Sequence, residues 1–382
     1  MRGRRRARAR DRSVRPTKCR LPSHPAQAQG KRRHLSPDPS RYYNPAVARA
    51  ERDYSIEDHG AERVLRVDDR EYRTYYSARL LEMLIERKGL DRAPLYLPFK
   101  TTRGHHFLGP LFRYLSGRGA RSLRVLEVGC SFGHNTEYLE EQPLVAEIHA
   151  FDVDPDFVAM TRAKVDELGL RKVRQALALT DEATTRLPFG GGAFDIVLAV
   201  GVIEHLPPRG RHRHVDEYYR VLAPGGHIAI LDTPNRAFPL ETHSVGLPAI
   251  QWLPAGLAFG YARLFRPRFR GATFVDFDRH GAWRNASLAE CLPSRGADEL
   301  IDVTEEAGYG WTFFSTTARS RLRRAALPMF AVICGALRAA GRSPSLALPY
   351  FNLVLQKRPA VAGRTCQATL EDDRATPRSP GR

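Results

Sequence analysis

The stretch Val125–Gly133 combines residue types that could bind a cofactor. An apolar run of the kind that forms a buried strand ends in the pattern Glu127-x-Gly129-x-x-x-Gly133 and passes directly into a helix-like segment. Glycines at such a turn let the backbone approach a ligand closely, because they carry no Cβ atom. The N–H groups at the start of the following helix could bind a carboxylate or a pyrophosphate. The glycine pattern alone does not choose between these ligands.

A second carboxylate follows at the end of the next apolar run, 146–151. Asp152 stands 23 residues after Gly129, where a strand is expected to end beside the glycine loop. A carboxylate at that place can accept hydrogen bonds from both hydroxyl groups of a ribose. Asp154 precedes Pro155, a pair typical of a helix N-cap and the first helical residue, so we assign Asp154 to a cap. The glycine loop and Asp152 together predict a nucleoside site.

Three further blocks follow in order along the chain. Residues 187–195 contain Leu-Pro-Phe and then Phe-Asp, residues 204–206 read Glu-His-Leu, and residues 224–226 read Pro-Gly-Gly. In this order and spacing, the five blocks resemble the class I S-adenosylmethionine-dependent methyltransferases, over roughly residues 100–235 and the final strands. The resemblance implies S-adenosylmethionine as the cofactor and methyl transfer as the activity.

The resemblance also implies roles for individual residues. The residues that it places at the cofactor are Glu127, Gly129, Cys130, Ser131 and Gly133 in the glycine loop, Asp152 and Val153 at the ribose, Asp181 or Glu182 at the adenine, and Val200 near the methionine part. The segment before the Leu-Pro-Phe block is about two residues longer than is usual in the family, so the choice between the two adenine candidates stays open.

Two histidines are the candidate catalytic residues. His205 belongs to the Glu-His-Leu block, and His243 belongs to a Glu-x-His pattern that follows Thr-Pro-Asn at 233–235. This segment resembles a bacterial subgroup of small-molecule methyltransferases. Imidazole titrates near neutral pH, so either side chain could orient the acceptor or remove its proton. Each also has a structural interpretation, His205 as packing in the site wall and His243 as a solvated loop residue.

A metal-dependent alternative rests on the same residues. Small-RNA 2′-O-methyltransferases hold a divalent ion with two glutamates and two histidines in a Glu-x-x-Glu-His motif, which the segment ending in Glu204-His205 resembles. Gly201 stands where the first glutamate would be. Because one of four ligands is missing, we assign no metal ligand from the sequence.

Short apolar runs alternate with helix-like stretches from residue 123 onward, which is typical of a parallel sheet with helices on both faces. The predicted fold is α/β, a Rossmann-like doubly wound sheet with helical cap and lid insertions. Seven strands are expected, mostly parallel, with runs at 309–314 and 350–356 late in the chain and the last strand antiparallel.

The chain divides into four predicted regions. Residues 1–45 form an Arg-rich disordered tail and residues 358–382 a second one. Residues 46–120 form an N-terminal helical cap, with helical spacing of apolar residues at 70–88. Residues 121–357 form the methyltransferase domain. Lid or cap insertions interrupt it at 236–295 and 316–348.

The charge of the chain gives little support to nucleic-acid binding. The formal net charge is +18, but residues 1–34 alone contribute +12, and residues 35–357 carry only about +4. We therefore expect a small-molecule acceptor. Arginines that follow the apolar stretch in 247–270 are compatible with peripheral contact to an anionic membrane. Five scattered cysteines and a basic N-terminus without an apolar run predict a cytoplasmic protein.

Two other enzyme classes share part of the pattern. Gly129-Cys-Ser131-Phe-Gly133 fits the G-x-S-x-G turn of serine hydrolases, in which Ser131 would be the nucleophile. A nicotinamide-dependent oxidoreductase would prefer glycine where Ser131 stands. Both interpretations leave the later blocks unexplained.

Overall fold

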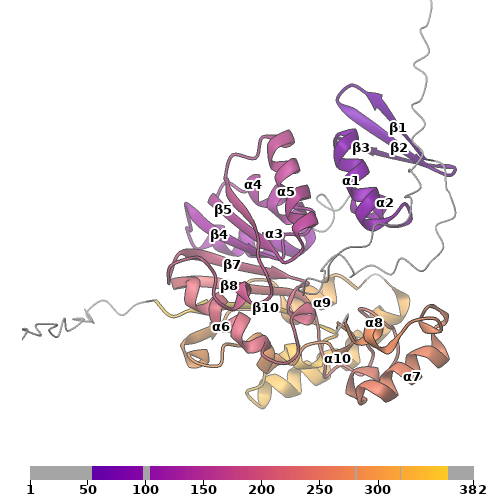
Figure 1. Cartoon of the computed structure of the whole chain (residues 1–382). Coiled ribbons are helices and arrows are strands. Elements are labelled where there is room, and N and C mark those ends of the chain that lie inside the picture. Colours follow the sequence, from indigo (N-terminus) through magenta and orange to yellow (C-terminus); the bar gives the residue numbers. More distant parts are fainter. Residues whose placement is uncertain (1–53, 98–103, 280–281, 319, 360–382) are drawn as a thin grey trace, which may run out of the picture.

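The structure, a computed structural model, describes residues 54–97, 104–279, 282–318 and 320–359 (Figure 1). The two predicted tails, 1–45 and 358–382, lie outside these residues except for Arg358 and Pro359. A seven-stranded sheet forms the centre of the described chain, and a separate three-stranded sheet precedes it in the sequence.

The central sheet has the strand order β6-β5-β4-β7-β8-β10-β9. Its strands are β4 (Leu123–Val128), β5 (Val145–Asp152), β6 (Val173–Ala178), β7 (Phe194–Val200), β8 (Leu222–Pro234), β9 (Leu300–Asp302) and β10 (Tyr350–Lys357). The pairs among β4 to β8 are parallel, whereas β10 is antiparallel to both of its neighbours. This confirms the predicted seven-stranded, mostly parallel sheet with an antiparallel last strand.

Helices cover both faces of this sheet, because successive side chains of a strand point to opposite sides. Leu126 belongs to the core that includes residues of α6 (Arg211–Val221). Its neighbour Val125 belongs to the core that includes residues of α3 (His105–Gly117) and α4 (His134–Glu140). Because β4 to β8 run parallel, their carboxyl ends lie at one edge of the sheet, where the loops that follow the strands can form a site.

One late strand was predicted wrongly. The apolar run 309–314 lies mostly in helix α9 (Gly310–Thr316), where Tyr309 and Phe313 are buried four residues apart. That spacing brings both side chains to one face of a helix. The sixth strand of this sheet along the chain is β9, at the edge of the sheet. It has only three residues and buries none of them fully. A strand of that kind leaves no apolar pattern in the sequence.

The predicted helical cap was wrong for residues 54–74. They form an antiparallel sheet of β1 (Tyr54–His59), β2 (Glu62–Val67) and β3 (Arg70–Thr74), followed by α1 (Ala78–Lys88) and α2 (Ala93–Tyr96). Two-residue turns join these strands, with positive φ angles at Gly60 and Asp68, as tight hairpins require. The spacing of the tyrosines at 72, 75 and 76 imitates a helix, but the helix begins only after Ser77, whose hydroxyl caps it.

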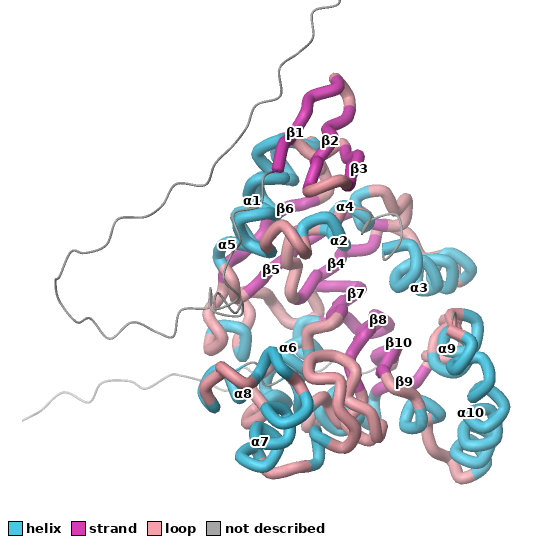
Figure 2. The backbone as a smooth tube through the Cα atoms, turned by 90° about the vertical axis from the view of Figure 1, so that its right-hand side faces the viewer, coloured by secondary structure: helices cyan, strands magenta, loops and turns pink. Residues whose placement is uncertain are grey.

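The two insertions contain most of the remaining helices. The first includes α7 (Ala255–Phe265) and α8 (Phe274–Arg279) and has a core of its own around Trp283. The second includes α10 (Arg321–Ala339), which packs beside α9. Figure 2 shows α7 and α8 on one side of the molecule and α10 on the other, with the strand ends between them. No helix in the described ranges is both long and apolar enough to cross a membrane.

Candidate cofactor and acceptor site

The glycine loop after β4 has the backbone geometry that glycine permits. Gly129 and Gly133 have φ angles of 70° and 68°, in the left-handed region that favours glycine. A Cβ atom at Gly129 would lie 2.7 Å from Cγ2 of Val202, and one at Gly133 would lie 3.0 Å from Oγ1 of Thr161. An added side chain would therefore overlap with Val202 at Gly129 and would make a tight contact with Thr161 at Gly133.

Replacing Gly129 by alanine is expected to destabilise the protein by about 2–4 kcal/mol, which combines the left-handed φ and the overlap with Val202. Gly169 is the matched control, since its φ is 62° and nothing lies within 4 Å of an added Cβ. Gly169→Ala should show the backbone cost alone in urea unfolding. The pair Gly129→Ala with Val202→Ala should recover the difference, and equal effects of the two single glycine variants would contradict the packing argument.

Glu127, the one acidic residue of β4, is 1% exposed. Its Oε2 accepts a hydrogen bond from the Thr136 hydroxyl, while Oε1 is buried without a hydrogen-bond partner in the described part of the chain. Burial raises the pKa of this carboxyl group to about 7. A buried acceptor with an unused oxygen is suited to a ligand's amino group.

Asp152, at the end of β5, is hydrogen-bonded to the glycine loop. Its Oδ2 accepts the Ser131 N–H at 2.8 Å, and its Oδ1 accepts the Asp154 N–H at 3.0 Å. Burial raises the pKa of the Asp152 carboxyl group. Asp154 accepts the Asp156 N–H at 2.9 Å and so caps α5 (Pro155–Leu168), which confirms its predicted role.

The other predicted cofactor residues lie along the same edge of the sheet. Val153 follows Asp152 and is half-buried, and Val200 ends β7 on the other side of β4. Cys130 differs, because its thiol is buried among Ala150 and other apolar residues, so only its backbone can face a ligand. Burial raises the pKa of this thiol well above its usual value.

Asp181 and Glu182 follow β6, the outermost strand of this edge, and both are exposed. The structure thus places them beyond Asp152 on the side away from β7, with no observation that selects one of them. Strands β6, β5, β4 and β7 are neighbours in this order, so the predicted positions form one continuous edge.

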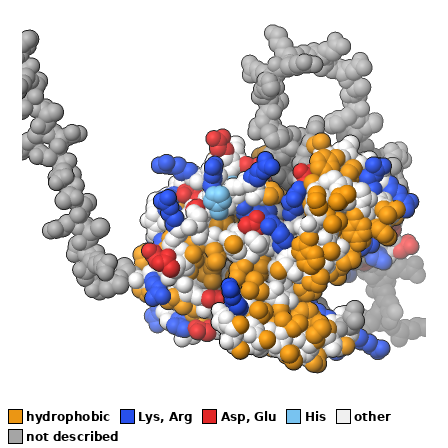
Figure 3. All heavy atoms as spheres, turned by 90° about the horizontal axis from the view of Figure 1, so that it is seen from below, with side chains coloured by type: hydrophobic (Ala, Val, Ile, Leu, Met, Phe, Trp, Pro, Cys, Tyr) orange, Lys and Arg blue, Asp and Glu red, His pale blue; other side chains and the backbone are white. Residues whose placement is uncertain are grey.

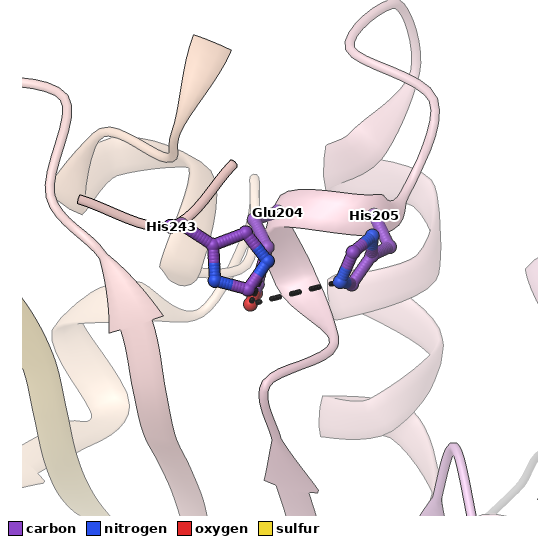
Figure 4. Close-up of side chains that lie close together, drawn as sticks. All are labelled: Glu204, His205 and His243. Atoms are coloured by element: carbon purple, nitrogen blue, oxygen red, sulfur yellow. Dashed lines mark ion pairs between the residues drawn. The ribbon is translucent and has the colours of Figure 1, made fainter. Parts of the chain in front are cut away.

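A second cluster lies next to this edge and joins the two candidate histidines (Figure 4). Glu204 and His205 come from the short helix η4 (Ile203–His205) after β7, and His243 comes from the loop after β8. Nε2 of His205 lies 4.0 Å from Oε1 of Glu204, and Nε2 of His243 lies 3.9 Å from the same atom. The ligand atoms of the three side chains lie within 4.8 Å of one another.

Glu204 is the buried member of this cluster, with 0% exposure and no hydrogen-bond partner for either carboxylate oxygen among the described residues. Burial raises the pKa of its carboxyl group to about 8, and the carboxylate of Asp232 acts in the same direction. The imidazole rings are partly exposed and 5.2 Å apart. The cluster is therefore accessible from the histidine side. It could hold a proton or a divalent cation.

Replacing Glu204 by glutamine is expected to flatten the dependence of stability on pH. Between about pH 4.5 and 8 the native carboxyl group keeps a proton that the unfolded chain releases, so the free energy of unfolding falls as the pH rises. Glutamine cannot ionise, and the slope should decrease by up to about 1.4 kcal/mol per pH unit. Urea unfolding of EDTA-dialysed protein at pH 5 and pH 8 measures this difference.

The slope of Glu204→Gln must be compared with that of the parent protein, because Glu127 titrates in the same pH range and contributes to the slope of both proteins. Glu82→Gln, at a solvent-exposed position on α1, is the control and should keep the slope of the parent protein. An unchanged slope in Glu204→Gln would show that the Glu204 carboxyl group is ionised throughout this range.

Two buried charged residues fix the backbone that carries the cluster. The Arg211 guanidinium donates to the carbonyl oxygens of Glu204 at 3.2 Å and Leu206 at 3.0 Å. Glu241 accepts four consecutive backbone N–H groups, at 2.6–2.8 Å, from the loop segment 243–246. The Glu-x-His pattern had pointed to this loop. Nothing in the sequence distinguished Arg211 from a solvated arginine.

The serine-hydrolase alternative requires an imidazole beside the Ser131 hydroxyl. Within the described ranges no hydrogen bond joins these groups, and Ser131 is bonded through its backbone to Asp152 and Thr161. The loop is thus organised around a carboxylate at the end of the neighbouring strand.

The same segment matches a known family. Residues 125–226 match the family described as a methyltransferase domain. This segment is therefore similar to methyltransferase domains. The match begins in β4, includes the glycine loop, Asp152 and the Glu204-His205 pair, and ends before the main part of β8.

Curated proteins are similar to this chain over part of their length. An uncharacterized protein of Haemophilus influenzae is 31% identical over 120 residues, which are 31% of this chain and 45% of that protein. The demethylmenaquinone methyltransferase of Thermus thermophilus is 32% identical over 29% of this chain and 47% of its own. The ubiquinone biosynthesis O-methyltransferase of Azorhizobium caulinodans is 32% identical over 36% and 52%, respectively. The chain thus spans about half the length of these relatives.

Among solved structures, a SAM dependent methyltransferase from Aquifex aeolicus is 23% identical. The similarity covers 41% of this chain and 81% of that one, with a TM-score of 0.29.

Proposed function

We propose that the protein transfers a methyl group from S-adenosylmethionine to a small, apolar acceptor. The observation that carries the proposal is Asp152, which is bonded to the glycine loop at the end of β5, inside the segment that matches the methyltransferase family. The names of two relatives support an apolar acceptor, because those proteins act in menaquinone and ubiquinone synthesis.

The residues of the site fit this cofactor. The unused carboxylate oxygen of Glu127 would accept the ammonium group, and Asp152 would accept the ribose hydroxyls. When bound, S-adenosylmethionine supplies an electrophilic methyl group on a sulfonium, so the protein has to align the acceptor and remove its proton. His205 and His243, with Glu204 between them, would take that proton.

Calorimetry with S-adenosylhomocysteine, followed by acceptor screening with labelled S-adenosylmethionine, tests the proposal. We expect a Kd for S-adenosylhomocysteine in the micromolar range, and no binding of NAD. A protein that binds neither S-adenosylmethionine nor S-adenosylhomocysteine would refute it.

A metal-assisted transfer, for example to a 2′-hydroxyl of RNA, is the second candidate. Glu204 has two buried oxygens without a hydrogen-bond partner, and two imidazoles lie about 4 Å from one of them. One carboxylate and two histidines suit a divalent transition metal. Titration of EDTA-treated protein with Zn²⁺ or Mn²⁺ should then show one site that Glu204→Gln weakens at least tenfold. Equal binding by both proteins would exclude this site.

A further inference from the structure

The outward side of α10 is apolar over most of its length. No charged residue lies between Arg324 and Arg338. Met329, Val332 and Ile333 are 56%, 74% and 40% exposed. The opposite side of the helix packs against α9 and buries Cys334. A helix that exposes large apolar side chains on this scale marks a surface that contacts something other than water.

Helix α7 repeats this arrangement in the other insertion. It buries Ala258 and Ala262 against its own lobe, while Leu257, Leu264 and Phe265 are 64%, 69% and 56% exposed. Trp252, just before α7, and Phe274 and Val275, at the start of α8, are exposed as well. Ala258 and Ala262 of α7 therefore face inward, with Phe259 and Tyr261 packed beside them, whereas Leu257, Leu264 and Phe265 face outward.

The two helices lie at the same end of the molecule, the lower end in Figures 1 and 2. Seen from below, hydrophobic side chains gather over two lobes (Figure 3). We call this surface the apolar face. Its members are Trp252, Leu257, Leu264, Phe265, Phe274, Val275, Met329, Val332 and Ile333.

The charges around the apolar face are mostly basic, and the nearby acidic side chains Asp278 and Glu305 are paired with Arg284 and Arg338. Residues 242–275 and 307–359 contain no Asp or Glu, although the chain as a whole has 42 acidic residues. Exposed arginines lie near the ends of the two helices: Arg263 is in the last turn of α7, Arg270 lies five residues past its end, and Arg321 and Arg324 are in the first turn of α10. An apolar surface with a predominantly basic border complements an anionic lipid surface, because headgroup charge and acyl chains lie at adjacent depths.

We propose that the apolar face binds the surface of a bilayer that contains anionic lipids, with α7 and α10 both lying in the interface. The sequence pointed only to 247–270, and α10 is the second half of the contact. The arginines would contact phosphate groups, and the exposed apolar side chains would enter the boundary with the acyl chains. The proposal does not depend on methyl transfer, because binding is measured without cofactor or acceptor.

Co-sedimentation of the full chain with vesicles tests this proposal. The vesicles contain either phosphatidylcholine alone or phosphatidylcholine mixed with phosphatidylglycerol. We expect binding to the mixed vesicles that weakens with salt. The partition coefficient should fall about tenfold in Leu257→Ser/Phe265→Ser and again in Met329→Ser/Val332→Ser. Leu95→Ser, at a position 69% exposed on α2 outside the apolar face, is the control and should bind like the parent protein.

Two results would overturn the proposal. The Arg-rich segment 1–34 could bind anionic vesicles by itself, and then both double variants would bind as well as the parent protein. If the apolar face instead joins two copies of the chain, the lipid-free protein would sediment as a dimer that Leu257→Ser/Phe265→Ser dissociates, with no change in vesicle binding. Thermal unfolding followed by circular dichroism shows which variants are folded, and the single variant Val332→Ser replaces a double variant that is not.

Discussion

Replacing Lys164 by methionine is expected to lower the free energy of unfolding by about 3–5 kcal/mol, because it removes an ammonium group that pairs with a buried carboxylate. Lys164 is 0% exposed, and its Nζ lies 3.1 Å from Oε2 of Glu137, which is itself only 2% exposed. The ammonium group also donates to the Tyr76 hydroxyl at 2.9 Å. Methionine preserves much of the volume and none of these interactions.

This buried cluster joins three segments of the chain that meet at the glycine loop. Tyr76 follows the three-stranded sheet, Glu137 lies in α4 and Lys164 lies in α5. The ring of Phe132, a residue of the glycine loop, lies 4.1 Å from the Lys164 ammonium. Loss of Lys164 should therefore also loosen the loop and weaken the proposed binding of S-adenosylhomocysteine.

Urea unfolding with a double variant separates charge from packing. Lys164→Met combined with Glu137→Gln removes both charges, and it should recover at least half of the stability lost in Lys164→Met. Arg79→Met is the control, because Arg79 is largely exposed and pairs with Glu167 at 3.5 Å, so its loss should cost about 1 kcal/mol or less. Equal effects of Lys164→Met and Arg79→Met would show that the buried pair contributes no more than a surface pair.

The sheet and the backbone of its glycine loop could be predicted because their signals are local. In β7 six of the seven residues are apolar, which is typical of a parallel strand buried on both faces. The turns with glycines at positive φ and the helix cap at Asp154-Pro155 are also determined by residues adjacent in the sequence, so their residue types reveal them. Asp152 was predictable from spacing alone, since it ends the strand beside the glycine loop.

The rest of the candidate site depends on contacts between distant residues. Lys164 and Arg211 lie in helices whose sequences read as partly solvated, yet each is buried by a segment more than 70 residues away in the sequence. Glu204 and His205 were seen as parts of one motif, but the approach of His243 to Glu204 follows from the loop that Glu241 organises. Side-chain burial of this kind leaves no periodic pattern.

Replacing Asp152 by asparagine is expected to weaken S-adenosylhomocysteine binding by about 100-fold, or about 2.7 kcal/mol. The carboxylate accepts N–H groups from Ser131 and Asp154, one on each oxygen. An asparagine amide can accept on one side only, and its NH₂ group would face the other N–H donor. The substitution therefore removes the charge offered to the ribose and releases one of the two bonds that hold the loop and the strand end together. Hydrogen bonds to a charged acceptor contribute about 1.5–3 kcal/mol each, so the loss of one or two accounts for the expected effect.

Asp156→Asn is the matched control for this change. Asp156 lies four residues further on, is exposed, and contributes only its backbone N–H to the cap at Asp154. Calorimetry should show the Kd of the parent protein for this control. If Asp152→Asn is folded and binds S-adenosylhomocysteine as tightly as the control, the ribose does not lie at the end of β5. If both variants bind equally weakly, the effect comes from the start of α5. Only a loss confined to Asp152 ties the glycine loop to a ribose-containing cofactor, because Asp152 is the carboxylate bonded directly to that loop.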